Sequence, residues 1–189
     1  MAAPERLIDA LAAYRQRWPG EAATVALFEE LLAGVPTSDP AHPFRRERLA
    51  GHLTASAWLV AADGARVLLT HHRKLGLWLQ LGGHADGDRD LVRAALKEAQ
   101  EESGLEGLRV DGDGIFDLDR HWIPDHKGVP AHWHYDVRYV VRAGADEAFV
   151  VSDESHALAW REIAELAESE AADASVRRMA QKWLSRRGR

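Results

Sequence analysis

The 189 residues carry a net charge of −6 and include no cysteine. The length suits one compact domain with an appended element, and the acidic balance argues against a nucleic-acid partner, because a phosphate backbone needs a basic face. The absence of cysteine excludes disulfides, thiolate metal sites and cysteine nucleophiles.

The first fifty residues predict helices. Apolar side chains recur near a period of 3.6 over residues 7–14 and again over residues 26–32, and each run is followed by a break that contains glycine and proline. We therefore predict a helical extension over residues 1–50 and a main domain over residues 51–189. The apolar surface of the extension could form a homodimer interface or pack on the main domain itself.

From residue 51 the pattern predicts strands around a central helix. Residues 54–60 and 66–70 form a hairpin signal around the turn residues Asp63-Gly64. A short strand over residues 78–81 is expected to end at Gly82-Gly83. A helix is expected over residues 90–103, with Gly104 as its C-terminal stop.

The later part of the chain continues the mixture of strands and helices. Further strands are expected over residues 108–118, interrupted by glycines, and over residues 132–142 and 157–160. Helices are expected over residues 161–169 and 173–187. The inward face of the last helix is predicted to carry Val176, Met179, Ala180, Trp183 and Leu184. Together these elements predict an α/β or α+β sandwich with a mixed sheet.

The sequence shows no sign of export or of a membrane partner. The first residues lack the apolar core of a signal peptide, and no run of 18 apolar residues occurs. We therefore expect a cytoplasmic protein.

Three glutamates share one face of the helix predicted over residues 90–103. Glu101 and Glu102 follow Glu98 by three and four residues, which is a rotation of about 300° and 400° around a helix. Crowded carboxylates repel one another, and a hard divalent cation such as Mg²⁺ or Mn²⁺ would turn that repulsion into attraction. A solvated acidic helix face is the alternative interpretation.

The segment from Gly83 to Leu105 resembles the Nudix box. The positions that fit the family pattern are Gly83, Glu98, Ala99, Glu101, Glu102, Gly104 and Leu105. The resemblance implies an α/β/α Nudix sandwich with a mixed sheet behind the N-terminal helical extension. It also implies metal-dependent hydrolysis of a diphosphate bond in a small molecule linked to a nucleoside diphosphate.

The resemblance further implies the residues of the site. Glu98, Glu101 and Glu102 would hold Mg²⁺ or Mn²⁺ together with the carbonyl of Gly82, and the metal would neutralise the diphosphate and activate water. The general base differs between family members. It could be a box glutamate or an acid on the loop before residue 157, where Asp153 and Glu154 lie, and our choice is Glu154.

Two positions depart from the family pattern. Arg89 stands where the family has its first glutamate, and a nearby aspartate, of which Asp88 is our first choice, could replace that carboxylate. Lys97 stands at the family arginine, so the positive charge stays but the planar guanidinium fork is lost. An alternative function is therefore a catalytically weak Nudix-fold module that binds a nucleotide and regulates another process.

Histidines form a second cluster, since seven of the ten lie between residues 71 and 134. His132 and His134 alternate along a predicted strand and so point to one face, where they could bind a transition metal or a substrate phosphate. His84, after the glycine pair, could reach the same pocket. The segments 82–84, 121–124 and 132–136 together resemble a poorly characterised bacterial Nudix subgroup.

Two arginines are candidates for binding the substrate phosphates. Arg73 precedes the strand at Trp78, and Arg138 shares a strand face with His134. Together with His84, His132 and His134, the two arginines make up the predicted site for a small nucleotide-type substrate.

Overall fold

The computed structural model describes residues 3–35, 38–39, 42–72, 76–112, 114–126, 128–150 and 155–187. The chain separates into two compact units. The first consists of residues 1–55, 83–94 and 113–138, and the second of residues 56–82, 95–112 and 139–189. Among the helices in these described ranges, none combines the length and apolar character that a membrane crossing requires.

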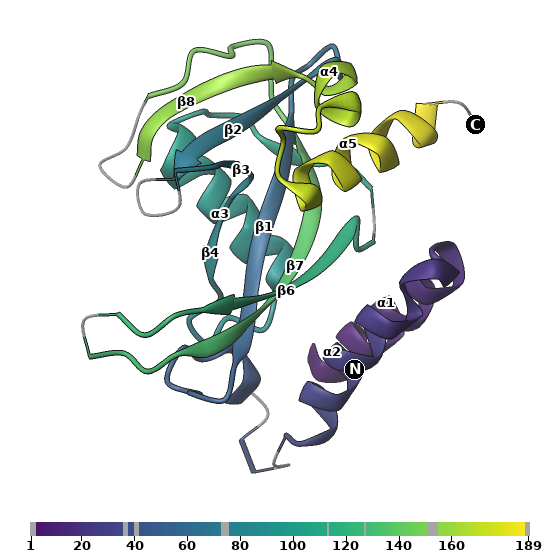
Figure 1. Cartoon of the computed structure of the whole chain (residues 1–189), viewed down its shortest axis with the longest axis vertical. Coiled ribbons are helices and arrows are strands. Elements are labelled where there is room, and N and C mark those ends of the chain that lie inside the picture. The colour runs from purple at the N-terminus through teal and green to yellow at the C-terminus, as the bar shows by residue number, and fades with distance from the viewer. Residues whose placement is uncertain are drawn as a thin grey trace. The chain divides into compact units, whose positions relative to one another are not determined.

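Eight strands in the described part of the chain form one sheet in the order β3-β2-β1-β7-β5, with β4 beside β1, β6 beside β7 and β8 beside β2. The strands are β1 (His52–Val60), β2 (Arg66–His72), β3 (Trp78–Leu79), β4 (Leu81–His84), β5 (Arg109–Val110), β6 (Asp117–Ile123), β7 (His132–Arg142) and β8 (Ser155–Glu162). The predicted β1–β2 hairpin is confirmed, with Val60 opposite Val67 in an antiparallel pair. Figure 1 shows β8 alongside β2, where Trp160 lies opposite Leu68.

The glycine pair does not end a strand, contrary to the sequence prediction. Strand β4 runs through Gly82 and Gly83 to His84. A Cβ added at Gly82 would lie 2.7 Å from the Cα of Ser56 on β1, so only glycine lets the two strands approach this closely. The turn comes later, at Asp86 and Gly87, where the backbone φ angles are +49° and +84°.

Helix α3 (Leu91–Ser103) confirms the predicted central helix. Asp90 caps its start, because Oδ1 accepts a hydrogen bond of 3.1 Å from the backbone N–H of Arg93. Gly104, at a φ of +67°, ends it and donates from its N–H to the carbonyl of Gln100 at 2.9 Å. Ala99 is fully buried in a core cluster with Leu59, Leu68 and other residues of the second unit.

The second unit also contains the two C-terminal helices, α4 (Ile163–Glu168) and α5 (Ala174–Arg187). They lie against each other in Figure 1. The buried face of α5 carries Val176, Met179, Ala180 and Trp183, as predicted. Leu184 was predicted to face inward and does not, since it is 39% exposed. It follows Trp183 by one residue, and the helix turns about 100° over that step.

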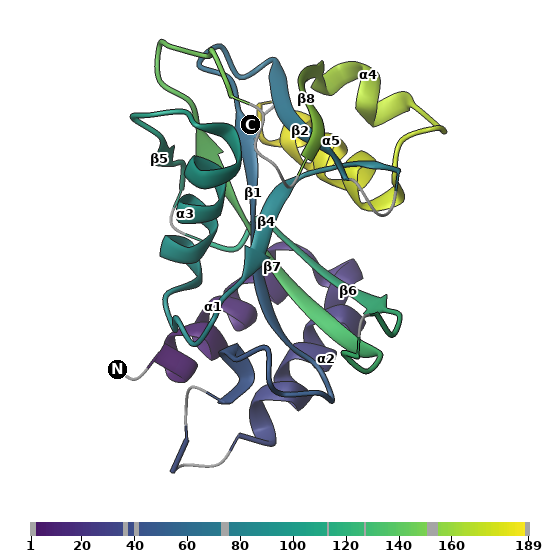
Figure 2. The same ribbon diagram turned by 90° about the vertical axis from the view of Figure 1, so that its left-hand side faces the viewer.

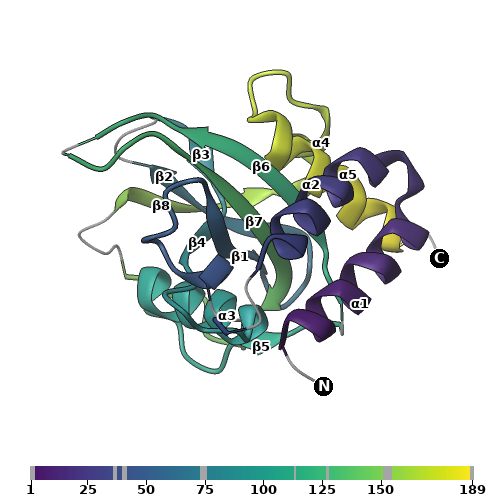
Figure 3. The same ribbon diagram turned by 90° about the horizontal axis from the view of Figure 1, so that it is seen from below.

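The first unit contains the N-terminal helices and the β6–β7 hairpin. The helical elements are α1 (Ala3–Arg17), α2 (Ala22–Ala33) and the short 3-10 helices η1 (Pro19–Glu21) and η2 (His42–Phe44). Figure 3 shows α1 and α2 side by side, and Figure 2 shows the hairpin of β6 and β7. The ring of Phe28 on α2 meets Tyr135 on β7 edge to face, with centroids 5.4 Å apart. The predicted helices of the extension are confirmed, and the boundary after residue 50 stays a prediction.

Candidate functional site

The three glutamates lie on α3 as the sequence predicts. Glu98 and Glu102 are half-buried and Glu101 is exposed. The backbone N–H of Gly82 on β4 donates a 2.7 Å hydrogen bond to Oε1 of Glu102. A hydrogen bond to an ionised carboxylate is stronger than one between neutral groups. This bond therefore holds the Glu102 carboxylate beside the backbone of β4.

Lys97 contacts one of these glutamates. Its Nζ lies 3.3 Å from Oε2 of Glu101, one helical turn later, and the two side chains are 65% and 58% exposed. Solvent screens such a pair, which contributes little to stability. Lys97 thus offers Glu101 a single contact from a point charge, without the two parallel hydrogen bonds that an arginine can form.

Asp88, our candidate replacement for the missing box glutamate, accepts hydrogen bonds from residues at the N-terminal end of α3. Its carboxylate accepts hydrogen bonds from Arg93 Nε at 2.8 Å, from Arg93 Nη2 at 2.7 Å and from the backbone N–H of Asp90 at 2.9 Å. The neighbouring Asp86 accepts hydrogen bonds from two of the three guanidinium nitrogens of Arg46, Nε and Nη2. A catalytic role for Asp88 stays a prediction.

Two of the hydrogen-bond donor atoms of Arg89 are unsatisfied within the described part of the chain. Its Nε and Nη2 atoms are buried, and neither has a hydrogen-bond partner among the described residues. A buried guanidinium nitrogen without a partner costs free energy that a bound anion or a facing carboxylate would recover. At the position where the family has a glutamate, this chain therefore has a half-buried arginine with two buried, unused donor atoms.

The donor set on α3 fits a hard divalent cation. Three carboxylates on adjacent turns and the backbone carbonyl of Gly82 offer only oxygen ligands, which Mg²⁺ and Mn²⁺ prefer. The Gly82–Glu102 hydrogen bond shows that the helix and β4 meet at this point. The residues implied by the Nudix resemblance are thus present on these two elements, and their role as metal ligands stays a prediction.

The structure brings His84, His132 and His134 together and adds His52. The ring of His52 lies 5.2 Å from the ring of His84, 5.0 Å from that of His132 and 4.8 Å from that of His134, measured between centroids. Sequence reasoning missed His52, since it stands 80 positions before His132 and starts a strand. Only the order of the sheet, in which β1 is next to β7, brings it to this group.

The family model of the NUDIX domain matches residues 51–183, which is more than half of the chain. The chain belongs to the Nudix family. This membership places it in the class of Nudix-type pyrophosphohydrolases. No curated protein matches the sequence.

Solved structures agree with the Nudix assignment. A NUDIX family hydrolase from Clostridium perfringens is 22% identical, with a TM-score of 0.56 over 71% of this chain and 96% of that one. An Ap4A hydrolase from C. elegans is 18% identical, with a TM-score of 0.56 over 72% and 97%. A MutT protein from Methanosarcina mazei Go1 is 16% identical, with a TM-score of 0.56 over 74% and 96%. At such low sequence identities, these structures are evidence about the fold alone. They confirm the predicted Nudix sandwich with a mixed sheet.

Three of the clustered histidines, His52, His84 and His134, are poor candidates for attracting phosphate by charge. Burial lowers the pKa of His84 to about 4 and the pKa of His134 to about 2. Burial also lowers the pKa of His52. These imidazoles are therefore uncharged at neutral pH, and an uncharged imidazole offers a lone pair that suits a metal.

Arg138 is buried among acids, although β7 places it as predicted. Its side chain is 2% exposed. Its Nε donates to Asp136 at 2.7 Å, its Nη1 to Asp117 at 3.1 Å, and its Nη2 lies 3.3 Å from Asp119. Burial by itself would lower the pKa of Arg138, but the carboxylates of Asp136 and Asp117 raise it above its ordinary value. We therefore assign Arg138 to this buried ionic cluster and leave it out of the proposed substrate site.

Three predicted residues of the Nudix site lie outside the described residues. They are Arg73, predicted to bind phosphate, and Asp153 and Glu154, the loop acids considered as the general base. Their roles stay predictions.

Proposed function

We propose that this chain hydrolyses the diphosphate bond of a small molecule linked to a nucleoside diphosphate, and that it needs Mg²⁺ or Mn²⁺ to do so. The observation that carries the proposal is the hydrogen bond between the Gly82 N–H and the Glu102 carboxylate. It fixes one acid of the Nudix helix next to the strand that supplies the backbone carbonyl. Membership of the Nudix family supports the reaction class.

In this proposal the residues of α3 and β4 hold the cation. Glu98, Glu101, Glu102 and the carbonyl of Gly82 supply oxygen ligands, and the bound metal would neutralise the diphosphate and activate water. The N–H of Gly82 orients Glu102, and Lys97 makes one solvent-screened contact with Glu101. Glu154 is our candidate for accepting a proton from the attacking water, and Arg73 is our candidate for holding a phosphate.

One observation favours a second function, a Nudix-fold module that binds a nucleotide with little turnover. Arg89 replaces a family glutamate with a cation, and its Nε and Nη2 have no hydrogen-bond partner in the described part of the chain. Free guanidinium donors suit an anionic ligand. The three glutamates of α3 argue for the hydrolase, since a binding module has no need of three crowded acids.

A hydrolysis screen separates the two functions. The purified full chain is incubated with a panel of nucleoside diphosphate derivatives in Mg²⁺, in Mn²⁺ or in excess chelator, and the products are separated by chromatography. We expect cleavage of the diphosphate bond in one class of substrate, loss of cleavage in chelator and its return with added metal. Absence of turnover with either metal, together with thermal stabilisation by a nucleotide, would support the binding module instead.

Restoring the family residue at position 89 tests the role of that arginine. We expect Arg89→Glu to raise metal-dependent kcat/KM about tenfold, which corresponds to about 1.4 kcal/mol of transition-state stabilisation. The reason is that the substitution removes a cation and supplies a carboxylate at the family position. Arg89→Gln, which removes the charge without adding an acid, is the matched control and should gain less. An unchanged rate in Arg89→Glu would indicate that an aspartate such as Asp88 already provides this function.

A further inference from the structure

A second group of metal ligands in this chain is built entirely from imidazoles. We infer that His52, His132 and His134 form a binding site for a transition-metal ion of the kind that Zn²⁺ represents. The three residues come from the starts of β1 and β7, and all three belong to the first compact unit. The donor chemistry differs from that of the glutamates on α3, because it offers nitrogen and no oxygen.

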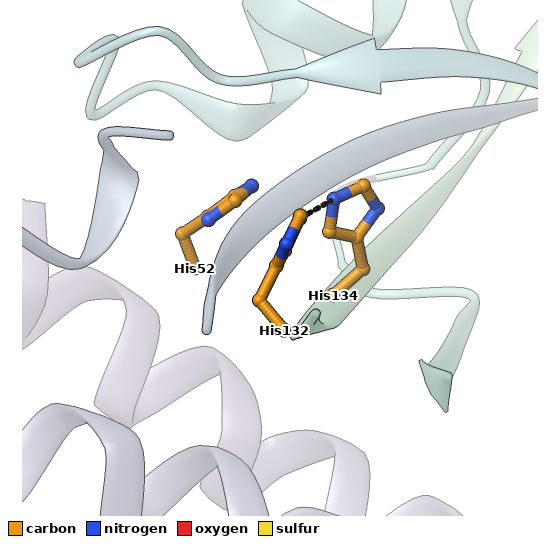
Figure 4. A group of neighbouring side chains, drawn as sticks. All are labelled: His52, His132 and His134. Carbon is orange, nitrogen blue, oxygen red and sulfur yellow. Dashed lines mark hydrogen bonds between the residues drawn. The ribbon is translucent and has the colours of Figure 1, made fainter. Parts of the chain in front are cut away.

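The spacing of the ring nitrogens suits one ion. Each of the three histidines offers a nitrogen, and these atoms all lie within 4.8 Å of one another. Figure 4 shows the three side chains near one another, with a dashed line that joins His132 and His134. Nε2 of His132 lies 3.1 Å from Nε2 of His134. Two imidazole nitrogens on one tetrahedral zinc ion are about 3.3 Å apart, given zinc–nitrogen bonds of about 2.0–2.1 Å. The His132–His134 pair therefore already has the spacing of two ligands.

Backbone carbonyls fix the tautomers of two of the rings. Nδ1 of His132 lies 2.8 Å from the carbonyl oxygen of Pro130, and Nδ1 of His52 lies 3.3 Å from that of Arg48. A carbonyl oxygen only accepts, so Nδ1 carries the hydrogen in each ring and Nε2 carries the lone pair. Metal-binding histidines in proteins are commonly oriented by this kind of hydrogen bond from the second ring nitrogen.

His52 provides independent support. It is 1% exposed, and its Nε2 is buried with no hydrogen-bond partner among the described residues. A hydrogen bond between His132 and His134 satisfies those two rings but leaves the nitrogen of His52 unused. Because a buried polar atom without a partner is costly, a metal ion that binds all three nitrogens accounts for the arrangement better than a hydrogen bond does.

Two further histidines and several charged side chains lie close to the three proposed ligands. The rings of His84 and His121 lie 5.0 Å and 5.4 Å from the ring of His134. Nδ1 of His121 is 3.5 Å from the Asp119 carboxylate. Arg46, a cation that acts on His52 and His84, has its charge balanced by Asp86.

The ligand set selects the class of metal. Neutral imidazoles suit Zn²⁺ and other first-row transition metals, whereas Mg²⁺ takes oxygen ligands. Three protein ligands leave a fourth position on a tetrahedral ion, which water or an anionic oxygen of a ligand can take.

Metal content measured on the full chain tests this inference. The protein is stripped with chelator, incubated with Zn²⁺ in the presence of millimolar Mg²⁺, desalted and measured by elemental analysis, and Zn²⁺ affinity is measured by competition with a chromogenic chelator. We expect one Zn²⁺ ion per chain. We expect His134→Gln to weaken Zn²⁺ binding at least about 100-fold. Co²⁺ bound in place of Zn²⁺ should give the visible absorption spectrum of a cobalt ion with a low coordination number. The His134→Gln variant should lack this spectrum.

Two matched variants separate this site from other sources of binding. His126→Gln removes an exposed histidine from the hairpin loop, and Glu102→Gln removes a box acid; both should retain one Zn²⁺ ion. Circular dichroism verifies that each variant is folded, and the measurement on the unaltered chain does not depend on any variant. Absence of stoichiometric Zn²⁺ in the unaltered chain would overturn the inference. So would equal affinity of the His134→Gln and His126→Gln variants, or loss of Zn²⁺ in Glu102→Gln alone.

Discussion

Glu102→Gln is expected to reduce metal-dependent kcat/KM by at least about 100-fold while the fold remains intact. The substitution removes the negative charge that would bind the cation. It keeps an oxygen at the same place in the side chain, so the Gly82 N–H can still donate to it. Turnover is measured against Mg²⁺ concentration, and thermal unfolding is measured in parallel.

Glu106→Gln is the control for this prediction. Glu106 is exposed and lies just beyond the end of α3, so its substitution removes one charge close in sequence without touching the acids of the box. Its turnover should match that of the unaltered chain. If Glu102→Gln also retained full turnover, the proposed metal site would be refuted.

Arg138→Met is expected to have the largest effect on stability. It removes a fully buried cation from three aspartates, Asp117, Asp119 and Asp136. Removing one partner of a buried ion pair lowers the free energy of unfolding by about 3–5 kcal/mol, because the remaining buried charge is left uncompensated. We expect the free energy of unfolding, measured by urea denaturation at neutral pH, to fall by about this amount.

Two comparisons check the origin of that loss. Arg109→Met replaces an exposed arginine on β5 and should change the free energy of unfolding by less than about 0.5 kcal/mol. Adding Asp136→Asn to Arg138→Met removes one of the uncompensated charges and should recover part of the loss. A loss below about 1 kcal/mol in Arg138→Met would show that the aspartates do not depend on this arginine.

Local patterns predicted most of the secondary structure, because its causes lie within a few residues. Asp90 caps α3 and Gly104 ends it, as expected of an acid and a glycine at the ends of an apolar-periodic segment. The alternation over residues 132–142 matched β7 at both ends. The spacing of Glu98, Glu101 and Glu102 placed three acids on one helix face, since helix geometry alone fixes that relation.

The errors arose where a distant part of the chain decides the outcome. The glycines at 82 and 83 were predicted to end a strand, yet β4 continues through them, and the close approach of Ser56 on β1 accounts for the glycine at position 82. Leu184 is apolar and was placed inward, but the packing of α5 turns it toward solvent. Arg138 shares a strand with His134, and only the neighbouring strand β6 showed that aspartates surround it.

The sequence by itself determined the family, the acidic helix and the alternation that puts His132 and His134 on one face, because each depends on spacing along a single element. Only the tertiary structure decided that His52 joins those two histidines and that Arg138 is buried among carboxylates. Both depend on which strands become neighbours in the sheet. Strand neighbours are chosen by the packing of the whole core, and no local spacing encodes that choice.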